Sequence, residues 1–190
     1  MKKIACATGN NQKFGLGRAI LADFDIELIQ KPIDIDEIQG EEPEKVLRDK
    51  VMKAYEILKE PVVVTDDWWD IPALGGFPGA YMKSINHWFE PQDFIHLMQD
   101  KRDRRIFLHA HLAYFDGSRL ELFQSTLEGR VADAPRGEFG PPVMHVAEMD
   151  HDDGKTISEV YDQELQHLPK RLKNTGDAWP KLGEWLKENA

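Results

Sequence analysis

The spacing of apolar and polar positions in the first third of the chain predicts strands that alternate with helices. Lys3 to Thr8 is a short apolar run typical of a buried strand, and the apolar positions from Phe14 to Phe24 recur at helical spacing. A second strand is expected from Ile26 to Gln30. A long amphipathic helix should begin at Pro43, because proline is favoured in the first turn of a helix. The β-branched run from Pro61 to Thr65 then predicts a strand covered on both faces.

The middle of the chain adds segments of another kind. Gly75 to Gly79 is a cluster of turn residues, and Pro91 should open a helix that runs to Met98. Two strand-like segments, Ile106 to Phe115 and Leu120 to Leu127, are separated by a short polar turn, so they predict a hairpin.

From Ser158 onward the pattern is helical, with interruptions around Pro169 and Gly176. No repeat or linker divides the chain, so residues 1–190 are expected to form one domain. Its order of elements is mixed α/β with an antiparallel insertion. We therefore expect two lobes around a central mixed sheet, with a ligand-binding cleft between them.

Composition restricts the classes of function. At 190 residues the chain can bury an apolar interior without disulfides, and its one cysteine, Cys6, is expected to be a core residue. The formal net charge of −10 argues against nucleic acid as a partner, because nonspecific binding needs a basic face. The apolar run after Met1-Lys2-Lys3 is too short for a signal peptide or a membrane span. We therefore expect a cytoplasmic protein without a membrane partner.

A polar turn follows the first strand. Thr8-Gly9-Asn10-Asn11-Gln12-Lys13 places flexible backbone, hydroxyl and amide groups and one ammonium group at a strand-to-helix junction. Free N–H groups and the helix dipole favour phosphate at such a junction. Taken by itself, the segment is better explained as a polar turn with a solvated lysine.

Two adjacent carboxylates, Asp66 and Asp67, follow the predicted strand that ends at Thr65. Ligands of open α/β sheets bind at the carboxyl ends of strands. Adjacent carboxylates repel each other unless a cation balances them, and Mg²⁺ prefers oxygen ligands. Glu37 lies in an acidic loop, from Asp34 to Gly40, and could complete a magnesium site with them. The alternative is that one of the two aspartates caps a turn.

Two lysines lie three residues apart on the predicted long helix. Lys50 and Lys53 point in related directions, so one of them could reach an anionic ligand. A solvated helix face is the alternative for each lysine taken alone.

Six blocks in one order resemble the inosine triphosphate pyrophosphatase family from near the first residue to about Lys155. The most specific block is Gly75 to Tyr81, and the next is Thr8-Gly9-Asn10-x-x-Lys13. The others are Glu37 to Gly40, Lys53-Ala54, Val64 to Asp67 and Ala134 to Gly140.

This resemblance implies an Mg²⁺-dependent homodimer that cleaves a nucleoside triphosphate, bound in the cleft, to monophosphate and pyrophosphate. The polar turn of Thr8, Gly9, Asn10 and Lys13 would hold the triphosphate, and Lys53 would add a second phosphate contact, which leaves Lys50 the weaker candidate. Glu37 and the pair Asp66-Asp67 would hold the metal. Asp67 would also activate water together with Lys13, and Phe139-Gly140 would form the surface on which the base stacks.

The chain departs from the family pattern at four places. Leu16 stands where the family usually has glutamate, and Trp68-Trp69 follows the catalytic aspartate, either as core residues or beside the cleft. The family also has a block that contains the aspartate that reads the base, and this chain has Pro141-Pro142 in its place. The Ser-His-Arg triplet near the end is absent, and two alignments of this segment stay open, one placing Lys170 and Arg171 there and the other Asn174.

The residues favour hydrolysis of non-standard purine nucleoside triphosphates, such as those of inosine, deoxyinosine and xanthosine, because the phosphate end of the pattern is intact. A changed base preference is one alternative, since the base-reading end is altered. A noncatalytic nucleotide-binding protein on the same fold is the other.

Overall fold

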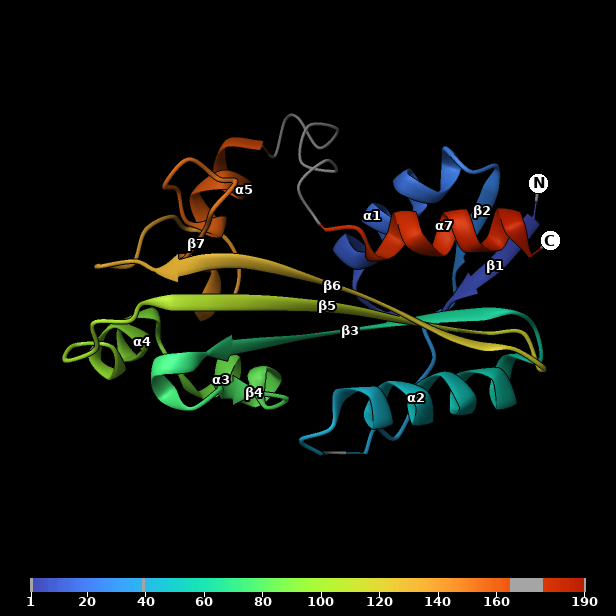
Figure 1. Ribbon diagram of the computed structural model, residues 1–190, viewed down its shortest axis with the longest axis horizontal. Coiled ribbons are helices and arrows are strands. Elements are labelled where there is room, and N and C mark those ends of the chain that lie inside the picture. Colours follow the sequence, from blue (N-terminus) through green and yellow to red (C-terminus); the bar gives the residue numbers. More distant parts are fainter. Residues whose placement is uncertain (1, 39, 165–175, 190) are drawn as a thin grey trace. The chain divides into compact units, whose positions relative to one another are not determined.

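The computed structural model describes residues 2–38, 40–164 and 176–189 (Figure 1). The strands are β1 (Lys2–Cys6), β2 (Ile26–Gln30), β3 (Val62–Ile71), β4 (Phe77–Gly79), β5 (Arg105–Phe115), β6 (Leu120–Val131) and β7 (Ala147–Met149). The helices are α1 (Asn11–Ala22), α2 (Pro43–Leu58), α3 (Met82–Trp88), α4 (Pro91–Leu97), α5 (Ile157–Glu164) and α7 (Ala178–Glu188), with short 3₁₀ turns η1 (Pro72–Leu74) and η2 (Pro142–His145).

The strands form one mixed sheet in the order β2-β1-β3-β5-β6-β7, and β4 pairs with β3. Strand β1 runs parallel to β2 and β3, whereas β4 is antiparallel to β3 and β7 is antiparallel to β6. The predicted α/β fold with a central mixed sheet is therefore confirmed. No helix among the described residues is both long and apolar enough to cross a membrane.

The chain divides into two compact units. Unit 1 comprises residues 1–67, 110–125 and 176–190, and unit 2 comprises residues 68–109 and 126–175. Strands β3, β5 and β6 each contribute residues to both units. The predicted cleft stays a prediction.

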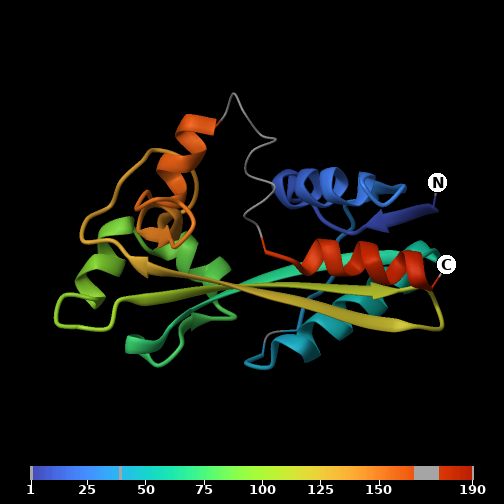
Figure 2. The same cartoon turned by 45° about the horizontal axis from the view of Figure 1, so that its top comes forward.

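In unit 1, helices cover both faces of the sheet. Val63 packs in a cluster with α1 and α7, whereas its neighbours Val62 and Val64 pack in a cluster with α2. Helices α1 and α7 accordingly lie side by side on one face, and α2 lies on the other (Figures 1 and 2). The β-branched run is fully buried, which confirms the prediction of a strand covered on both faces.

The apolar core of unit 2 includes Trp69, which is 6% exposed, together with Ile71, Phe94 and Ile106. Trp69 is thus a core residue. Trp68 points to the other face of β3, where its ring contacts that of His109 edge-on at 5.5 Å between centroids.

Two local predictions need correction. Strand β3 does not end at Thr65 but continues to Ile71, because β4 pairs with residues 69–71 and the core of unit 2 buries Trp69 and Ile71. Asp66 and Asp67 therefore lie within the strand. The predicted turn from 75 to 79 is confined to Gly75 and Gly76, since Phe77–Gly79 is strand β4, and helix α3 was not predicted. The predicted break at Pro169 lies outside the described residues.

Helix α1 can approach α7 only because residue 17 lacks a side chain. A Cβ added at Gly17 would lie 2.5 Å from ring atoms of Trp179, whereas one added at Gly15 would meet nothing within 4 Å. We predict that Gly17→Ala lowers the free energy of unfolding by about 1–3 kcal/mol through overpacking. Gly15→Ala, the matched control, should raise it by about 1 kcal/mol because alanine favours helix. Urea unfolding measures both, and equal effects would contradict the prediction.

Candidate active site

The turn between β1 and α1 is organised by the side chains of its own sequence. Asn10 caps α1, since its side-chain oxygen accepts hydrogen bonds from the backbone N–H groups of Gln12 and Lys13 at 2.9 and 3.1 Å. The Thr8 hydroxyl accepts one from the N–H of Asn10 at 3.1 Å. Gln30, at the end of β2, donates to the Thr8 carbonyl at 3.2 Å. Hydrogen bonds therefore fix the conformation of the predicted phosphate-binding turn, which leads directly into the N-terminus of α1. Gly9 is exposed.

Lys13, in the first turn of α1, reaches β3. Its ammonium nitrogen lies 3.1 Å from a carboxylate oxygen of Asp67, and both side chains are about one-third exposed. The structure therefore brings together the two residues that the sequence predicts as catalytic.

Lys50, from α2, reaches the same stretch of β3. Its ammonium group lies 2.8 Å from a carboxylate oxygen of Glu37 and donates to the backbone carbonyl of Thr65 at 3.2 Å. The side chain is only 13% exposed. A buried lysine between a carboxylate and a strand carbonyl is well fixed.

Asp66 lies within the electrostatic reach of all these groups. Burial is the main cause that raises the pKa of its carboxyl above the ordinary value. The ammonium groups of Lys50 and Lys13 oppose this rise in pKa, and the carboxylates of Asp67 and Glu37 add to it. We call these five residues the acid–lysine cluster.

Lys53 does not join the acid–lysine cluster. It forms an ion pair with Asp49 at 2.8 Å, one turn earlier on α2, and donates to the backbone carbonyl of Asp36 at 2.7 Å. The hydrogen bond with Asp49 raises the pKa of Lys53. Its predicted phosphate contact stays a prediction, whereas Lys50, the weaker candidate by sequence, is the lysine that the structure places beside Glu37 and Asp66.

The cluster is chemically suited to Mg²⁺ but is not a preformed cage. Its carboxylates are hard oxygen ligands, and the hydroxyl of Thr65, next to Asp66 on β3, is buried without a hydrogen-bond partner among the described residues. Within that same part of the chain, no group of three or more His, Cys, Asp or Glu is arranged to hold a metal ion. Mg²⁺ often binds through one or two carboxylates plus substrate phosphates, so the residues fit a metal that shares its ligands with a nucleotide.

The predicted base-stacking residue lies in unit 2. The ring of Phe139 packs against that of Tyr161 on α5, with centroids 4.8 Å apart and planes inclined by 31°. A pocket of about 660 Å³ beside it is lined by Gly137, Glu138, Glu159 and Asp162. Carboxylates only accept hydrogen bonds, so this lining suits the N–H groups of a base.

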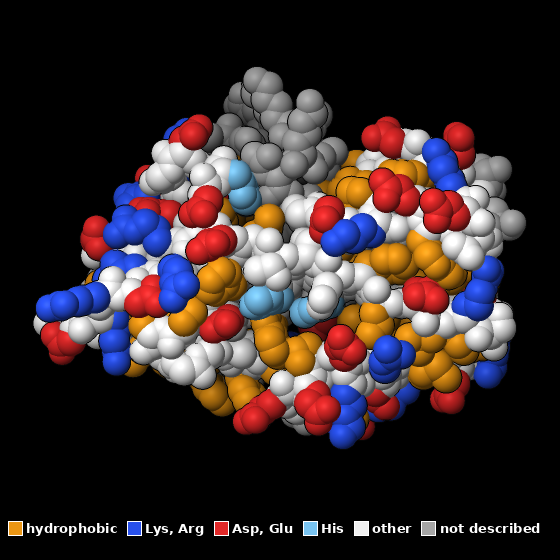
Figure 3. All heavy atoms as spheres, viewed as in Figure 1, with side chains coloured by type: hydrophobic (Ala, Val, Ile, Leu, Met, Phe, Trp, Pro, Cys, Tyr) orange, Lys and Arg blue, Asp and Glu red, His pale blue; other side chains and the backbone are white. Residues whose placement is uncertain are grey.

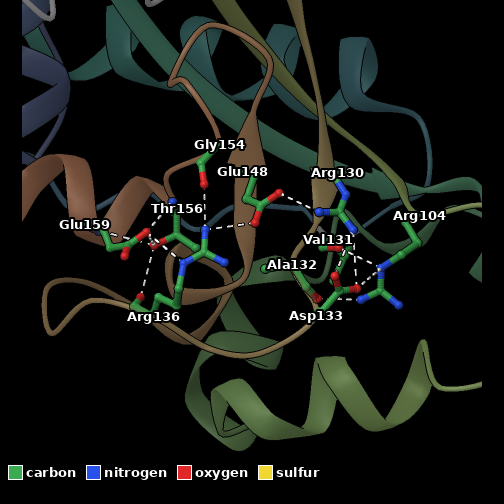
Figure 4. A network of polar contacts seen from close by, with 10 residues as sticks. All are labelled: Arg104, Arg130, Val131, Ala132, Asp133, Arg136, Glu148, Gly154, Thr156 and Glu159. Carbon is green, nitrogen blue, oxygen red and sulfur yellow. Dashed lines mark hydrogen bonds and ion pairs between the residues drawn. The ribbon is translucent and has the colours of Figure 1, made fainter.

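A buried ionic network anchors the loop that carries Phe139 (Figure 4). The Arg136 guanidinium donates to Glu148, to Glu159 and to the carbonyl of Gly154, at 2.8, 2.9 and 2.7 Å. Glu148, only 7% exposed, also accepts from Arg130 at 3.0 Å. Because Arg136 and Arg130 are both present, the negative charge of the buried Glu148 carboxylate is balanced. Removal of either arginine would lower the stability of the fold. The sequence analysis quoted Arg136 only as part of a family block and missed this role.

The departures from the family pattern have different structural contexts. Leu16 packs at the edge of the apolar cluster formed by α1 and α7, so this position belongs to the core of unit 1. Pro141 and Pro142 lead into the turn η2. The three residues considered in place of the missing triplet, Lys170, Arg171 and Asn174, lie outside the described residues.

On the face shown in Figure 3, acidic and basic side chains are interspersed without a continuous basic area.

Comparisons with known proteins bear on the whole chain. Relatives include inosine triphosphate pyrophosphatase 1 of Trypanosoma cruzi, which is 31% identical over 174 residues that cover 90% of this chain and 87% of that protein. The dITP/XTP pyrophosphatase of Methanopyrus kandleri is 29% identical over 190 residues, covering 98% and 97%.

Solved structures show the same fold. The Ham1 protein of Staphylococcus aureus matches with a TM-score of 0.76 at 21% identity, over all of both chains. A HAM1 protein of Coxiella burnetii matches with the same TM-score and identity, over 99% of this chain and all of that one. Residues 4–175 match the Ham1 family. Together with the relatives of more than 30% identity, this match shows that the chain belongs to the Ham1 family.

Proposed function

We propose that this protein hydrolyses nucleoside triphosphates with non-standard purine bases, such as those of inosine, deoxyinosine and xanthosine, to the monophosphate and pyrophosphate. The observation that carries the proposal is the acid–lysine cluster, which gathers two lysines and three carboxylates on β3 and its neighbours. Membership of the Ham1 family supports it, as do the names of the relatives, which are inosine triphosphate or dITP/XTP pyrophosphatases.

The cluster supplies what hydrolysis of a phosphoanhydride requires. The ammonium groups of Lys13 and Lys50 neutralise phosphate oxygens of the triphosphate, and the capped turn from Thr8 to Lys13 offers backbone N–H groups to the same ligand. Asp67 accepts a hydrogen bond from the attacking water and orients it. The new bond joins the water oxygen to phosphorus, the α–β anhydride bond breaks, and pyrophosphate leaves.

Mg²⁺ would be held by Glu37, Asp66 and Asp67 together with phosphate oxygens. It would neutralise charge on the transferred group and lower the cost of bringing a triphosphate beside three carboxylates. The raised pKa of Asp66, caused chiefly by burial, supports a site in which a cation balances these carboxylates.

A noncatalytic nucleotide-binding protein is the second candidate. Two observations favour it: Leu16 belongs to the apolar core where the family pattern has a glutamate, and Glu37 and Asp67 are each engaged by a lysine. The homodimer and the cytoplasmic location implied by the resemblance stay predictions, and light scattering of the purified protein tests the first.

The nucleotide panel tests the function. The protein is incubated with Mg²⁺ and one triphosphate at a time, and the amounts of monophosphate and pyrophosphate formed are measured. The panel comprises the triphosphates of inosine, deoxyinosine, xanthosine, guanosine, adenosine and the pyrimidine nucleosides. Equal amounts identify cleavage between the α and β phosphates. Binding without turnover of any member would establish the second candidate instead.

The same panel measures selectivity for the base. Discrimination depends on polar groups that a wrong base leaves unpaired. Pro141 and Pro142 have neither side-chain donors nor backbone N–H groups. We therefore predict that inosine is preferred over adenosine or guanosine triphosphate by less than about 10²-fold in kcat/KM. A larger preference would show that other residues read the base, and Lys170, Arg171 and Asn174 would be the first to mutate.

A further inference from the structure

The loop that carries Phe139 doubles back on itself at two glycines. Gly137 and Gly140 have φ values of +83° and +91°, in the left-handed region that favours glycine. At Gly137 there is no room for a side chain, because an added Cβ would lie 2.4 Å from the hydroxyl of Ser158 and 2.6 Å from the backbone nitrogen of Glu159. At Gly140 an added Cβ would lie 2.6 Å from the sulfur of Met144, whose side chain is flexible. The backbone before Phe139 is therefore packed closely against the start of α5, and the positive φ values restrict both ends of the loop.

One imidazole ring spans the two ends of this loop. Nδ1 of His145, at the end of η2, lies 3.0 Å from the carbonyl oxygen of Gly137, and Nε2 lies 3.1 Å from that of Gly140. The backbone carbonyl of His145 accepts a hydrogen bond from the N–H of Arg136 at 2.9 Å. The ring is thus held in place from the same loop that it contacts.

Both oxygens that face the ring can only accept hydrogen bonds. A neutral imidazole has one N–H group and could donate to just one of them, whereas the protonated ring has two and donates to both. Leaving a carbonyl and a ring nitrogen facing each other without a proton places two acceptors in contact, which is unfavourable. Both contacts can be hydrogen bonds at the same time only when the ring is protonated.

Other contacts fix the rest of the loop. Arg136 anchors its start through the ionic network with Glu148 and Glu159 (Figure 4). The N–H of Glu138 donates to the carboxylate of Asp162 on α5 at 2.8 Å. These contacts do not fix the distance between the carbonyl groups of Gly137 and Gly140, on the two sides of Phe139. The ring of His145 does, because it contacts both.

We infer that His145 is a positioning residue for the base: its protonated ring bonds both carbonyls and so holds the ring of Phe139 where a base stacks on it. The inference rests on the proposed function in one respect, that Phe139 receives the base. The part assigned to His145 follows from its two contacts.

The contribution of His145 to the pH profile must be distinguished from those of other titratable groups, which lie on the elements packed against η2. In the loop these are Arg136 and Glu138, on α5 they are Glu159, Tyr161 and Asp162, and on α4 they are Asp93 and His96. Most are committed to other partners. Asp93 accepts from the N–H of Glu90, Glu159 pairs with Arg136, and Asp162 accepts from Glu138. His96 on α4 therefore serves as the control.

The test measures binding of inosine monophosphate and of inorganic tripolyphosphate by calorimetry between pH 5.5 and 8. Loss of one hydrogen bond typically costs about 0.5–1.5 kcal/mol. In the wild-type protein, affinity for the monophosphate should therefore fall by up to about tenfold as His145 loses its proton. Affinity for tripolyphosphate, which has no base, should lack this component.

Two variants separate positioning from a general structural role. His145→Gln has an amide NH₂ with two donors, so it should retain affinity for the monophosphate and lose the dependence on pH. His145→Ala should bind the monophosphate about tenfold more weakly at pH 5.5, without a change for tripolyphosphate. The control variant His96→Gln should keep the wild-type profile.

The outcomes distinguish this inference from the proposed function. An unchanged pH profile in His145→Gln, or an equal loss for both ligands, would overturn the role of His145. Wild-type protein that binds the monophosphate with the expected profile but cleaves no triphosphate would remove the enzymatic function and retain the positioning role. Ring ¹⁵N spectra that show His145 neutral at pH 5.5 would overturn the inference without any reference to activity.

Discussion

Asp67→Asn is expected to lower kcat by about 10²-fold or more. The amide cannot take a proton from water, and it lacks the negative charge that the carboxylate places beside Lys13. The amide has nearly the shape of the carboxylate, and the side chain is about one-third exposed. The protein should therefore remain folded. Chelation of divalent cations should abolish turnover by the wild-type protein, since the proposed metal shares the same carboxylates.

The matched control is Asp70→Asn, the same change three residues further along β3. Asp70 lies 4.0 Å from the ring of His109 and has no place in the acid–lysine cluster, so kcat should stay within a few-fold of wild type. Thermal unfolding of both variants separates loss of chemistry from loss of structure. Full activity of Asp67→Asn would end its assignment as the residue that activates water.

The start of β3 illustrates what a local pattern can establish. Three consecutive valines favour a strand whatever lies around them, and helices on both faces of the sheet bury them. The end of β3 has no such pattern, because Asp66 to Asp70 mixes carboxylates with indoles. Its strand conformation depends on pairing with β4 and on burial of Trp69, and both are contacts that a linear reading does not contain.

The candidate site divides in the same way. The cap formed by Asn10 is local, and the sequence places this residue at a strand-to-helix junction, although the cap itself was not predicted. The ion pair between Lys13 and Asp67 joins positions that are far apart in the chain, and only the family resemblance connected them. His145 had no signal in the sequence, since its partners are backbone carbonyls that the loop conformation brings to it.

The choice between Lys50 and Lys53 had a signal that was not used. Lys50 lies four residues after Val46 and three after Leu47, both buried, so helical geometry turns it towards β3. Lys53 lies four residues after Asp49, the spacing of an ion pair on the helix surface, and it forms that pair. Position relative to the buried residues therefore favours Lys50, whereas adjacency to Ala54 favours Lys53, and both phosphate contacts stay predictions.

Alanine substitutions should therefore separate the three lysines. Charge-assisted hydrogen bonds contribute about 1.5–3 kcal/mol, so Lys13→Ala and Lys50→Ala should each weaken binding of a triphosphate by roughly 10- to 100-fold. Binding of the corresponding nucleoside should change little. Lys53→Ala loses a surface ion pair with Asp49 and should weaken triphosphate binding by no more than a few-fold.

Lys50→Ala also leaves Glu37 and Asp66 without their nearest ammonium group, so thermal unfolding must accompany the binding measurement. Lys50→Arg keeps the charge and should retain more of the affinity. If Lys53→Ala proved as damaging as Lys50→Ala for triphosphate alone, the phosphate contact would belong to Lys53, as the family resemblance implied. If any of these variants lost affinity for nucleoside and triphosphate alike, that lysine would support the fold, because a phosphate contact is absent from the nucleoside complex.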